Sequence, residues 1–100
     1  MIRHIVFFRL QEEIPADQRR TLLEEVQSKL EILPALIPEI QSFEIGINFT
    51  NDPKAADLSL LSSFRDIADL NIYQEHTEHK AFIEWNRNKC PKYSVVDYTF

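Results

Sequence analysis

Apolar and polar residues alternate along the first ten positions of the chain. In the run from Met1 to Leu10, even and odd positions fall on opposite faces of an extended strand. The even-numbered face carries Ile2, His4, Val6, Phe8 and Leu10. The odd-numbered face holds Ile5 and Phe7 between Arg3 and Arg9. This pattern predicts a strand with two partly buried faces.

The next apolar residues recur with the period of an α-helix. Pro15 suits a first helical turn, and Asp17 adds negative charge where the helix dipole favours it. The apolar stripe that follows has the spacing of an amphipathic helix and comprises Leu22, Leu23, Val26, Leu30 and Leu33. Pro34 is expected to end this helix, and Pro38 leaves room for at most one short turn before the next strand.

Two further alternating runs lie on either side of a turn cluster. From Ile40 to Thr50 the odd positions are apolar, and Gly46 is expected to mark a bulge or a close contact. The turn residues 51–53 follow, and a second alternating run extends from Leu58 to Phe64. We therefore expect the two runs to pair as a hairpin.

A second helical segment and a final strand complete the pattern. Asp66 is a good N-cap for the helix, and Thr77 is expected to cap or kink its continuation, which ends before Pro91. The side chains expected to point inward from its first part are Ile67, Leu70 and Tyr73. The closing run, Tyr93 to Phe100, is rich in the β-branched and aromatic residues typical of a strand.

The predicted order of elements is βαββαβ within a single domain, residues 1–100. This order is the split βαβ pattern of a ferredoxin-like α+β fold, with an antiparallel four-stranded sheet and both helices on one face. The other face would expose apolar side chains, which we expect to be Ile5, Phe7, Leu61, Val95 and Tyr93 or, depending on register, their counterparts. Because this patch is large for a soluble monomer, the pattern predicts a two-fold homodimer packed sheet to sheet.

Composition excludes several classes of function. The 11 Lys and Arg residues against 16 Asp and Glu give a net charge of −5, which argues against binding nucleic acid. The single glycine supplies neither a phosphate loop nor a dinucleotide fingerprint, so no nucleotide cofactor is expected. The single cysteine suits a reducing compartment, and the first apolar run is too short and too charged for a signal peptide or a membrane span. We expect a cytoplasmic protein.

Three histidines and one tyrosine are the candidates for chemistry. His76 and His79 follow Tyr73 at intervals of three residues, so neighbours in this series share a face if the helix continues. His4 lies on a strand among apolar residues, where an imidazole needs a partner. A pocket that collected these four residues would offer a base that titrates near neutral pH and a phenolic donor.

Plainer interpretations of the same residues stay open. A histidine among apolar residues can be a hydrogen-bonded structural residue, and Tyr73 can belong to the core. A metal site built from His76 and His79 with Glu75 or Glu78 lacks a third ligand fixed by the sequence, so no metal is expected. No Cys–His arrangement around Cys90 follows from the spacing.

Three segments of the chain resemble the stress-responsive dimeric α/β barrel (Dabb) family. They are Met1–Leu10, Ser63–Leu70 and Tyr73–His79. The strand histidine at position 4 and the Tyr-x-x-His-x-x-His spacing are the most specific parts, and Val96–Phe100 is similar to the family's last strand. The resemblance covers essentially the whole chain. It implies a ferredoxin-like protomer whose sheet packs against that of a second copy, with a cavity between sheet and helices.

The resemblance also implies roles for the candidate residues. A plant polyketide cyclase similar to this chain uses a Tyr and the second His of the same spacing for an aldol-type ring closure. By this resemblance His79 is the base, Tyr73 orients or polarises the substrate, and His4 and His76 line the pocket. Thr77 stands where the family commonly has proline, which predicts a less kinked helix.

Two functions follow from these observations. The first is a small dimeric barrel of the stress-responsive type that binds a small apolar or aromatic molecule without catalysis. The alternative is a cofactor-free cyclase or lyase that acts on a polyketide-like carbonyl substrate through His79 and Tyr73. Cofactor-free oxygenation, as in the related antibiotic-biosynthesis monooxygenases, is a lesser alternative.

Overall fold

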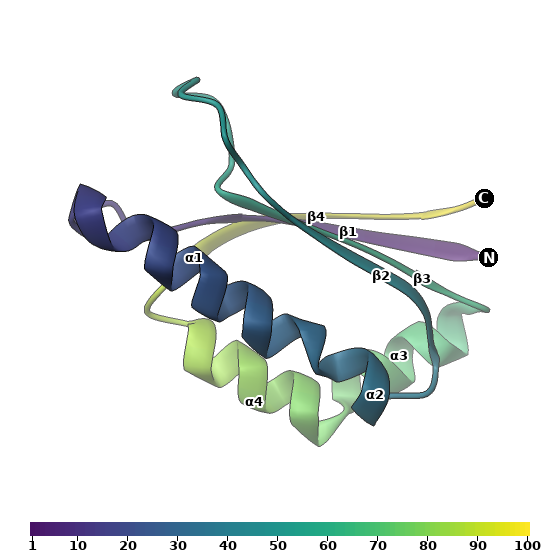
Figure 1. Cartoon of the computed structure of the whole chain (residues 1–100). Helices are drawn as coiled ribbons and strands as arrows, with labels where there is room; N and C mark the ends of the chain where they lie inside the picture. Colours follow the sequence, from purple (N-terminus) through teal and green to yellow (C-terminus); the bar gives the residue numbers. More distant parts are fainter.

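The computed structural model describes all residues from Met1 to Phe100. One antiparallel sheet of four strands, in the order β2-β3-β1-β4, carries the helices on one face (Figure 1). The elements along the chain are β1 (Ile2–Arg9), α1 (Ala16–Glu31), α2 (Leu33–Leu36), β2 (Ile40–Ile47), β3 (Leu58–Phe64), α3 (Ile67–Glu75), α4 (Thr77–Asn86) and β4 (Lys92–Thr99). The predicted ferredoxin-like α+β fold is confirmed.

The core lies between the sheet and the helices. The even-numbered face of β1 is buried as predicted, and it meets the buried side chains of β3 across the central pair of strands. The apolar stripe of α1 packs on this surface, with Leu23, Val26 and Leu30 buried. Alternation with a period of two in the strands and a helical period in α1 therefore specify the same core.

Pro15 and Pro34 lie near their expected places in the chain's helices but not at them. Pro15 is the residue before α1 rather than part of its first turn, and α1 ends at Glu31. Pro34 was predicted to end α1, but it lies in the first turn of α2. The helix α2 is the one short turn expected before the next strand. A proline is tolerated there because the first N–H groups of a helix have no partner within the helix.

The second helical segment is broken at His76, where the backbone is extended with φ −64° and ψ 139°. The kink expected in this segment is therefore present, one residue before Thr77. Thr77 does not cap α4, because the His76 imidazole does so by accepting a hydrogen bond from the backbone N–H of Glu78 at 3.1 Å. Asp66 caps α3 as predicted, whereas Ile67 is 61% exposed and does not point inward.

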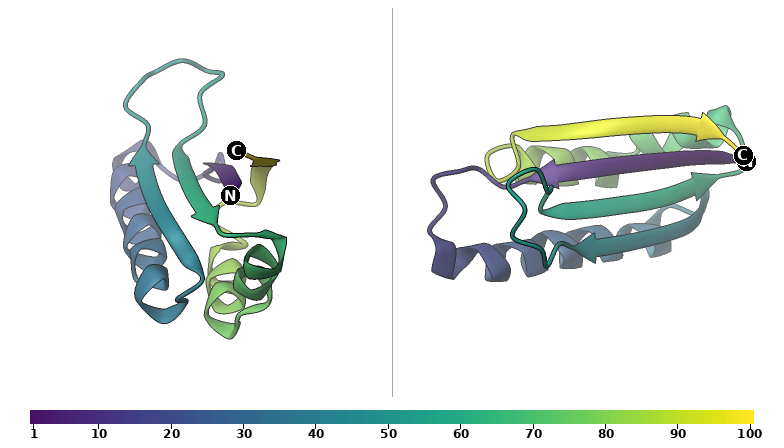
Figure 2. Two further views of the ribbon diagram at one scale, coloured as in Figure 1. Left: turned by 90° about the vertical axis from the view of Figure 1, so that its right-hand side faces the viewer. Right: turned by 90° about the horizontal axis from the view of Figure 1, so that it is seen from above.

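The strands β2 and β3 form the expected hairpin, and Gly46 marks a close contact rather than a bulge. A Cβ at Gly46 would lie 3.1 Å from Oγ of Ser59 on the paired strand. The register shift lies instead between Ile40 and Ser42. The connection between the two strands stands away from the rest of the molecule (Figure 2), and it carries the exposed Phe49.

The register of β4 decides which of its residues lie on the uncovered face of the sheet. Val95 lies opposite Val6 and Tyr93 lies opposite Phe8, so both face the helices and not the uncovered side. Alternation places their neighbours on the uncovered side instead. The apolar residues of this open face are Ile5, Phe7, Leu61, Val96 and Tyr98. The open face is visible from above in the right-hand view of Figure 2.

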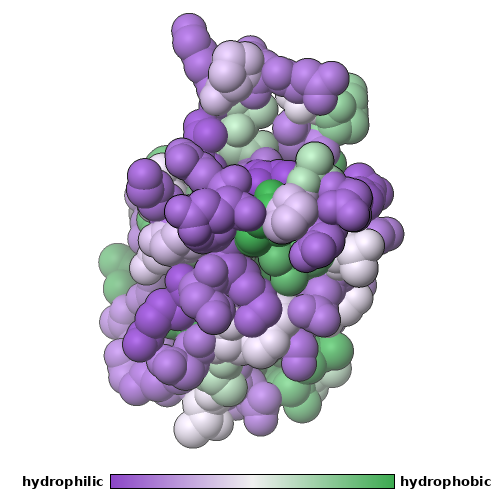
Figure 3. All heavy atoms as spheres, turned by 90° about the vertical axis from the view of Figure 1, so that its left-hand side faces the viewer, coloured by the Kyte–Doolittle hydropathy of each residue, from purple (hydrophilic) through white to green (hydrophobic).

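The two ends of the chain lie side by side. The N-terminal ammonium of Met1 donates to the carbonyl of Phe100 at 3.3 Å, and the Phe100 N–H donates to the Met1 carbonyl at 3.1 Å. At the opposite end of the sheet, where α1 begins, the surface is mostly hydrophilic and encloses a recessed apolar area (Figure 3). None of the helices combines the length and the apolar character that a membrane crossing requires.

Candidate functional site

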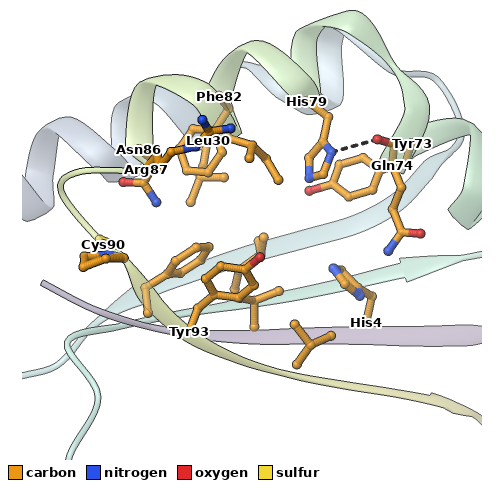
Figure 4. A pocket seen from close by; sticks show the side chains of 16 residues that line it. His4, Leu30, Tyr73, Gln74, His79, Phe82, Asn86, Arg87, Cys90 and Tyr93 are labelled. Carbon is orange, nitrogen blue, oxygen red and sulfur yellow. Dashed lines mark hydrogen bonds between the residues drawn. The ribbon is translucent and has the colours of Figure 1, made fainter.

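A cavity of about 390 Å³ lies between α4 and the strands β1 and β4 (Figure 4). It is lined by 16 residues, of which 10 are hydrophobic. The cavity exists because the helices do not fully cover β4, which lies at the edge of the sheet. Tyr93 and Val95 face the helices yet remain 57% and 45% exposed. The cavity is therefore open to a ligand along this edge.

Tyr73 lies at one end of the cavity, near the C-terminal end of α3. Its ring centroid is 5.1 Å from that of Phe64 and 4.3 Å from that of His79. Burial raises the pKa of the Tyr73 hydroxyl above its ordinary value. The group therefore stays protonated at neutral pH and can donate a hydrogen bond.

His79 lies beside Tyr73 on the first turns of α4. Its Nδ1 donates to the carbonyl of Gln74 at 3.2 Å. This carbonyl is free because α3 ends one residue later, and the last carbonyls of a helix lack partners within it. A carbonyl can only accept, so the hydrogen bond holds the proton on Nδ1 and leaves Nε2 with a lone pair. Burial lowers the pKa of His79. The hydrogen bond to Gln74 raises this pKa and the charges of His4 and His76 lower it, so the net direction is downward. His79 is thus a neutral base.

His4 reaches the same end of the cavity from β1. It is 5% exposed, and its ring centroid is 6.1 Å from that of Tyr73. Its Nδ1 pairs with Oδ1 of Asp97, the residue directly opposite on β4. The carboxylate fixes the orientation of the ring and leaves Nε2 for the cavity.

The opposite end of the cavity contains polar groups that the sequence reasoning did not single out as a site. Asn86 is 4% exposed, and its Oδ1 has no hydrogen-bond partner. Burial raises the pKa of the Cys90 thiol to about 11, so this group is a neutral thiol at pH 7. Arg87 lines the cavity but also pairs with Glu84 at 2.8 Å on the surface.

A comparison of the whole chain with known protein families finds a match. Residues 2–100 match the family described as "Stress responsive A/B Barrel Domain" (Dabb). The chain belongs to this family.

Relatives of this Dabb protein span its whole length. An uncharacterised protein of Streptomyces coelicolor is 30% identical over 103 residues, which cover 100% of both chains. The crystal structure of a dimeric protein of unknown function from Bacteroides fragilis has a ferredoxin-like fold and a TM-score of 0.88, with 28% identity over 99% of this chain and 95% of that chain. A hydroxynitrile lyase from Passiflora edulis shares the fold, with a TM-score of 0.78 and 20% identity over 99% of this chain and 95% of that chain.

The Dabb fold brings together three of the four residues expected to form the site. His4, Tyr73 and His79 line the cavity, whereas His76 does not. Because the helix breaks at His76, the imidazole is used as the cap of α4 and its Nδ1 accepts from Glu78. No group of three or more His, Cys, Asp or Glu side chains in this Dabb protein could hold a metal ion.

Asp97 and Asn86 are the site residues that the sequence reasoning missed. A signal existed for each. Asp97 is the one acidic residue within the apolar last strand, and Asn86 follows His79 by two helical turns on the same face. Neither signal is specific without the register of β4 or knowledge of where the helices stop covering the sheet.

Proposed function

We propose that this Dabb protein is a homodimeric barrel that binds a small apolar or aromatic molecule in the cavity between β1, β4 and α4. The observation that carries this proposal is the cavity itself. Its volume of about 390 Å³ falls within the range of small-molecule sites, and most of its lining residues are hydrophobic. Val6, Phe8 and Phe82 are among its apolar lining residues, and His79 and Asn86 lie toward opposite ends of it (Figure 4).

The binding proposal is tested with 4-hydroxybiphenyl, a small aromatic probe that carries one hydroxyl. We expect a Kd on the order of tens of micromolar by isothermal titration calorimetry, given its small number of heavy atoms. The variant Val95→Trp should abolish binding, because the indole would fill the open side of the cavity from a half-exposed position.

The matched control is Ile72→Trp, which places the same side chain on an exposed position of α3 outside the cavity. This variant should bind like the unaltered protein. Absence of binding to the unaltered protein, or equal binding by Val95→Trp, would contradict the proposed function.

The dimer in this proposal forms through the open face of the sheet. The helices form a single layer and cover only one side of the four strands, and the open face carries apolar side chains on three of them. Exposed apolar patches of this kind mark protein–protein interfaces. The related Bacteroides fragilis protein is dimeric, which supports a dimeric state for this chain.

A second candidate function is cofactor-free cyclase or lyase chemistry on a polyketide-like carbonyl compound. The observation that favours it is the direct contact of Tyr73 and His79, with ring centroids 4.3 Å apart in the cavity. Nε2 of His79 would remove a proton next to a carbonyl, and the electron pair would move onto the oxygen, where the Tyr73 hydroxyl donates a hydrogen bond. The carbon of this enolate would attack a second carbonyl carbon of the same molecule, and the proton would return from His79 to the new alkoxide. The Passiflora edulis lyase is an example of a lyase with this fold.

The reverse reaction offers a simple assay for the second candidate. With 4-hydroxy-4-phenyl-2-butanone, His79 would take the hydroxyl proton, the carbon–carbon bond would break, and the electron pair would pass to the enolate of acetone as benzaldehyde leaves. His79→Ala and Tyr73→Phe should each slow benzaldehyde release by about 100-fold or more. His76→Ala, outside the cavity, should not. Equal rates for the unaltered protein and His79→Ala would exclude this function for the probe.

A further inference from the structure

Asn86 is a buried amide that hydrogen-bonds the Cys90 thiol and leaves its Oδ1 without a partner. Its side chain is almost fully enclosed, and Oδ1 has no hydrogen-bond partner. Leaving a buried polar group unpaired destabilises a protein, so such groups are rare in folded proteins. The end of α4 does not need this side chain, because the backbone carbonyl of Asn86 already accepts from the N–H groups of Lys89 and Cys90 at 3.0 and 2.9 Å.

The unfilled space beside this amide is the cavity. Asn86 is one of the residues that line it, and Figure 4 shows the amide reaching from α4 toward the end of the cavity at Cys90. Oδ1 of an amide is a hydrogen-bond acceptor, and here it is the atom left unpaired. A ligand hydroxyl can donate to it.

The spacing along α4 sets the length of a ligand that reaches both ends of the cavity. His79 and Asn86 are seven residues apart, which corresponds to about 10 Å along a helix. Phe82 and Ile83 line the cavity between them. Polar groups therefore mark the two ends of an apolar channel that runs beside α4.

We infer that the cavity takes an elongated aromatic ligand with a hydroxyl at each end, and that Asn86 determines specificity for the hydroxyl farther from Tyr73 and His79. This inference rests on the proposed binding function and refines it, since the proposed function alone requires no polar group at the Asn86 end. A ligand hydroxyl at this end would pair with the amide oxygen that the protein leaves unpaired.

A matched pair of probes tests the inference. The first is 4,4′-dihydroxybiphenyl, and the second is 4-hydroxy-4′-methylbiphenyl, in which a methyl group replaces one hydroxyl with little change in shape. The unaltered protein should bind the diol about tenfold more tightly, because the methyl compound leaves the amide oxygen buried and unpaired. Asn86→Leu should remove this preference or reverse it in favour of the methyl compound.

Two further variants keep the result interpretable. Asn86→Ala removes the amide without adding volume, and it should lose the preference even if leucine disturbs packing. Asn88→Leu makes the same chemical change two residues away on the exposed surface and should keep the tenfold preference.

The outcomes separate the two proposals. If neither probe nor 4-hydroxybiphenyl binds the unaltered protein, the proposed binding function fails and this inference fails with it. If the probes bind with equal affinity, or if Asn86→Ala retains the preference for the diol, the binding function stands and the role of Asn86 is overturned.

Discussion

Burial favours the neutral forms of three side chains that line the cavity. It is the largest cause of each shift: it raises the pKa of Tyr73 and Cys90 and lowers the pKa of His79. At pH 7 these three groups therefore offer a neutral base, a phenol and a thiol, and the cation of Arg87 is paired with Glu84. Such a surface suits uncharged aromatic ligands better than anions or cations.

The lowered pKa of His79 predicts how the free energy of unfolding changes with pH. Because the folded protein binds this proton less readily than the unfolded chain, whose histidine has the ordinary pKa of 6.5, the free energy of unfolding falls as the pH drops below that value. One proton limits the slope to about 1.4 kcal/mol per pH unit. Urea denaturation of the unaltered protein between pH 7 and about 5.5 should show this fall, and His79→Gln should reduce it. His76→Gln is the control and should retain it. An unchanged slope in His79→Gln would contradict the assignment.

At the scale of residues, the sequence was enough to identify His4, Tyr73 and His79 as neighbours but not to identify their partners. An unusual residue type at a characteristic spacing is visible in a sequence, as for the histidines. A partner such as Asp97 depends on strand register, which long-range packing determines. The unpaired state of the Asn86 oxygen depends on the shape of the cavity and has no local signature.

At the scale of elements, the break between α3 and α4 organises the site. The break at His76 leaves the Gln74 carbonyl free, and this carbonyl then holds the His79 imidazole in one tautomer. The imidazole of His76 in turn caps the helix that carries His79. Two histidines that seemed equivalent by spacing therefore have different tasks, one structural and one in the cavity.

The cap at His76 is open to a direct test. Replacing His76 with alanine removes the acceptor for the Glu78 N–H and should lower the free energy of unfolding by about 1 kcal/mol, the usual value of an N-cap. His76→Asn should restore it, because asparagine is a favoured N-cap residue. Urea denaturation provides the measurement. If the alanine and asparagine variants were equally stable, the imidazole would not act as a cap.

The elements themselves were predictable where one periodicity dominated. The alternation of β1 and the stripe of α1 both lead to the observed core, and Asp66 begins α3 as its side chain suggests. A kink near Thr77 was expected, but its position at His76 was not, because histidine is not a common cap. The face occupied by Val95 and Tyr93 stayed open until the register was known. Because β4 has apolar residues on both sides, its alternation does not indicate which side faces the helices.

At the scale of the whole molecule, the sheet has one covered face and one open face. The open face bears apolar side chains from β1, β3 and β4, with Phe7, Val96 and Tyr98 each more than 40% exposed in the single chain. The cavity lies on the covered side, so pairing through the open face leaves the open edge at Tyr93 and Val95 on the other side of the sheet.

The proposed dimer predicts the effect of a charge on this face. Val96→Glu would bury two carboxylates against an apolar surface and should convert the dimer into a monomer of 11.8 kDa at micromolar concentration. Light scattering measures the mass directly. Ile72→Glu adds the same charge on the exposed side of α3 and should remain dimeric. A monomeric mass for the folded, unaltered protein would refute the dimer.

The paired ends of the chain have a topological consequence. Since Met1 and Phe100 exchange backbone hydrogen bonds, the fold is nearly a closed ring. A short covalent link across this point, with a new opening in the projecting connection between β2 and β3, would give a circular permutant. Its chain would run β3, α3, α4, β4, β1, α1, α2 and β2, and it would keep every strand neighbour in the sheet and every wall of the cavity.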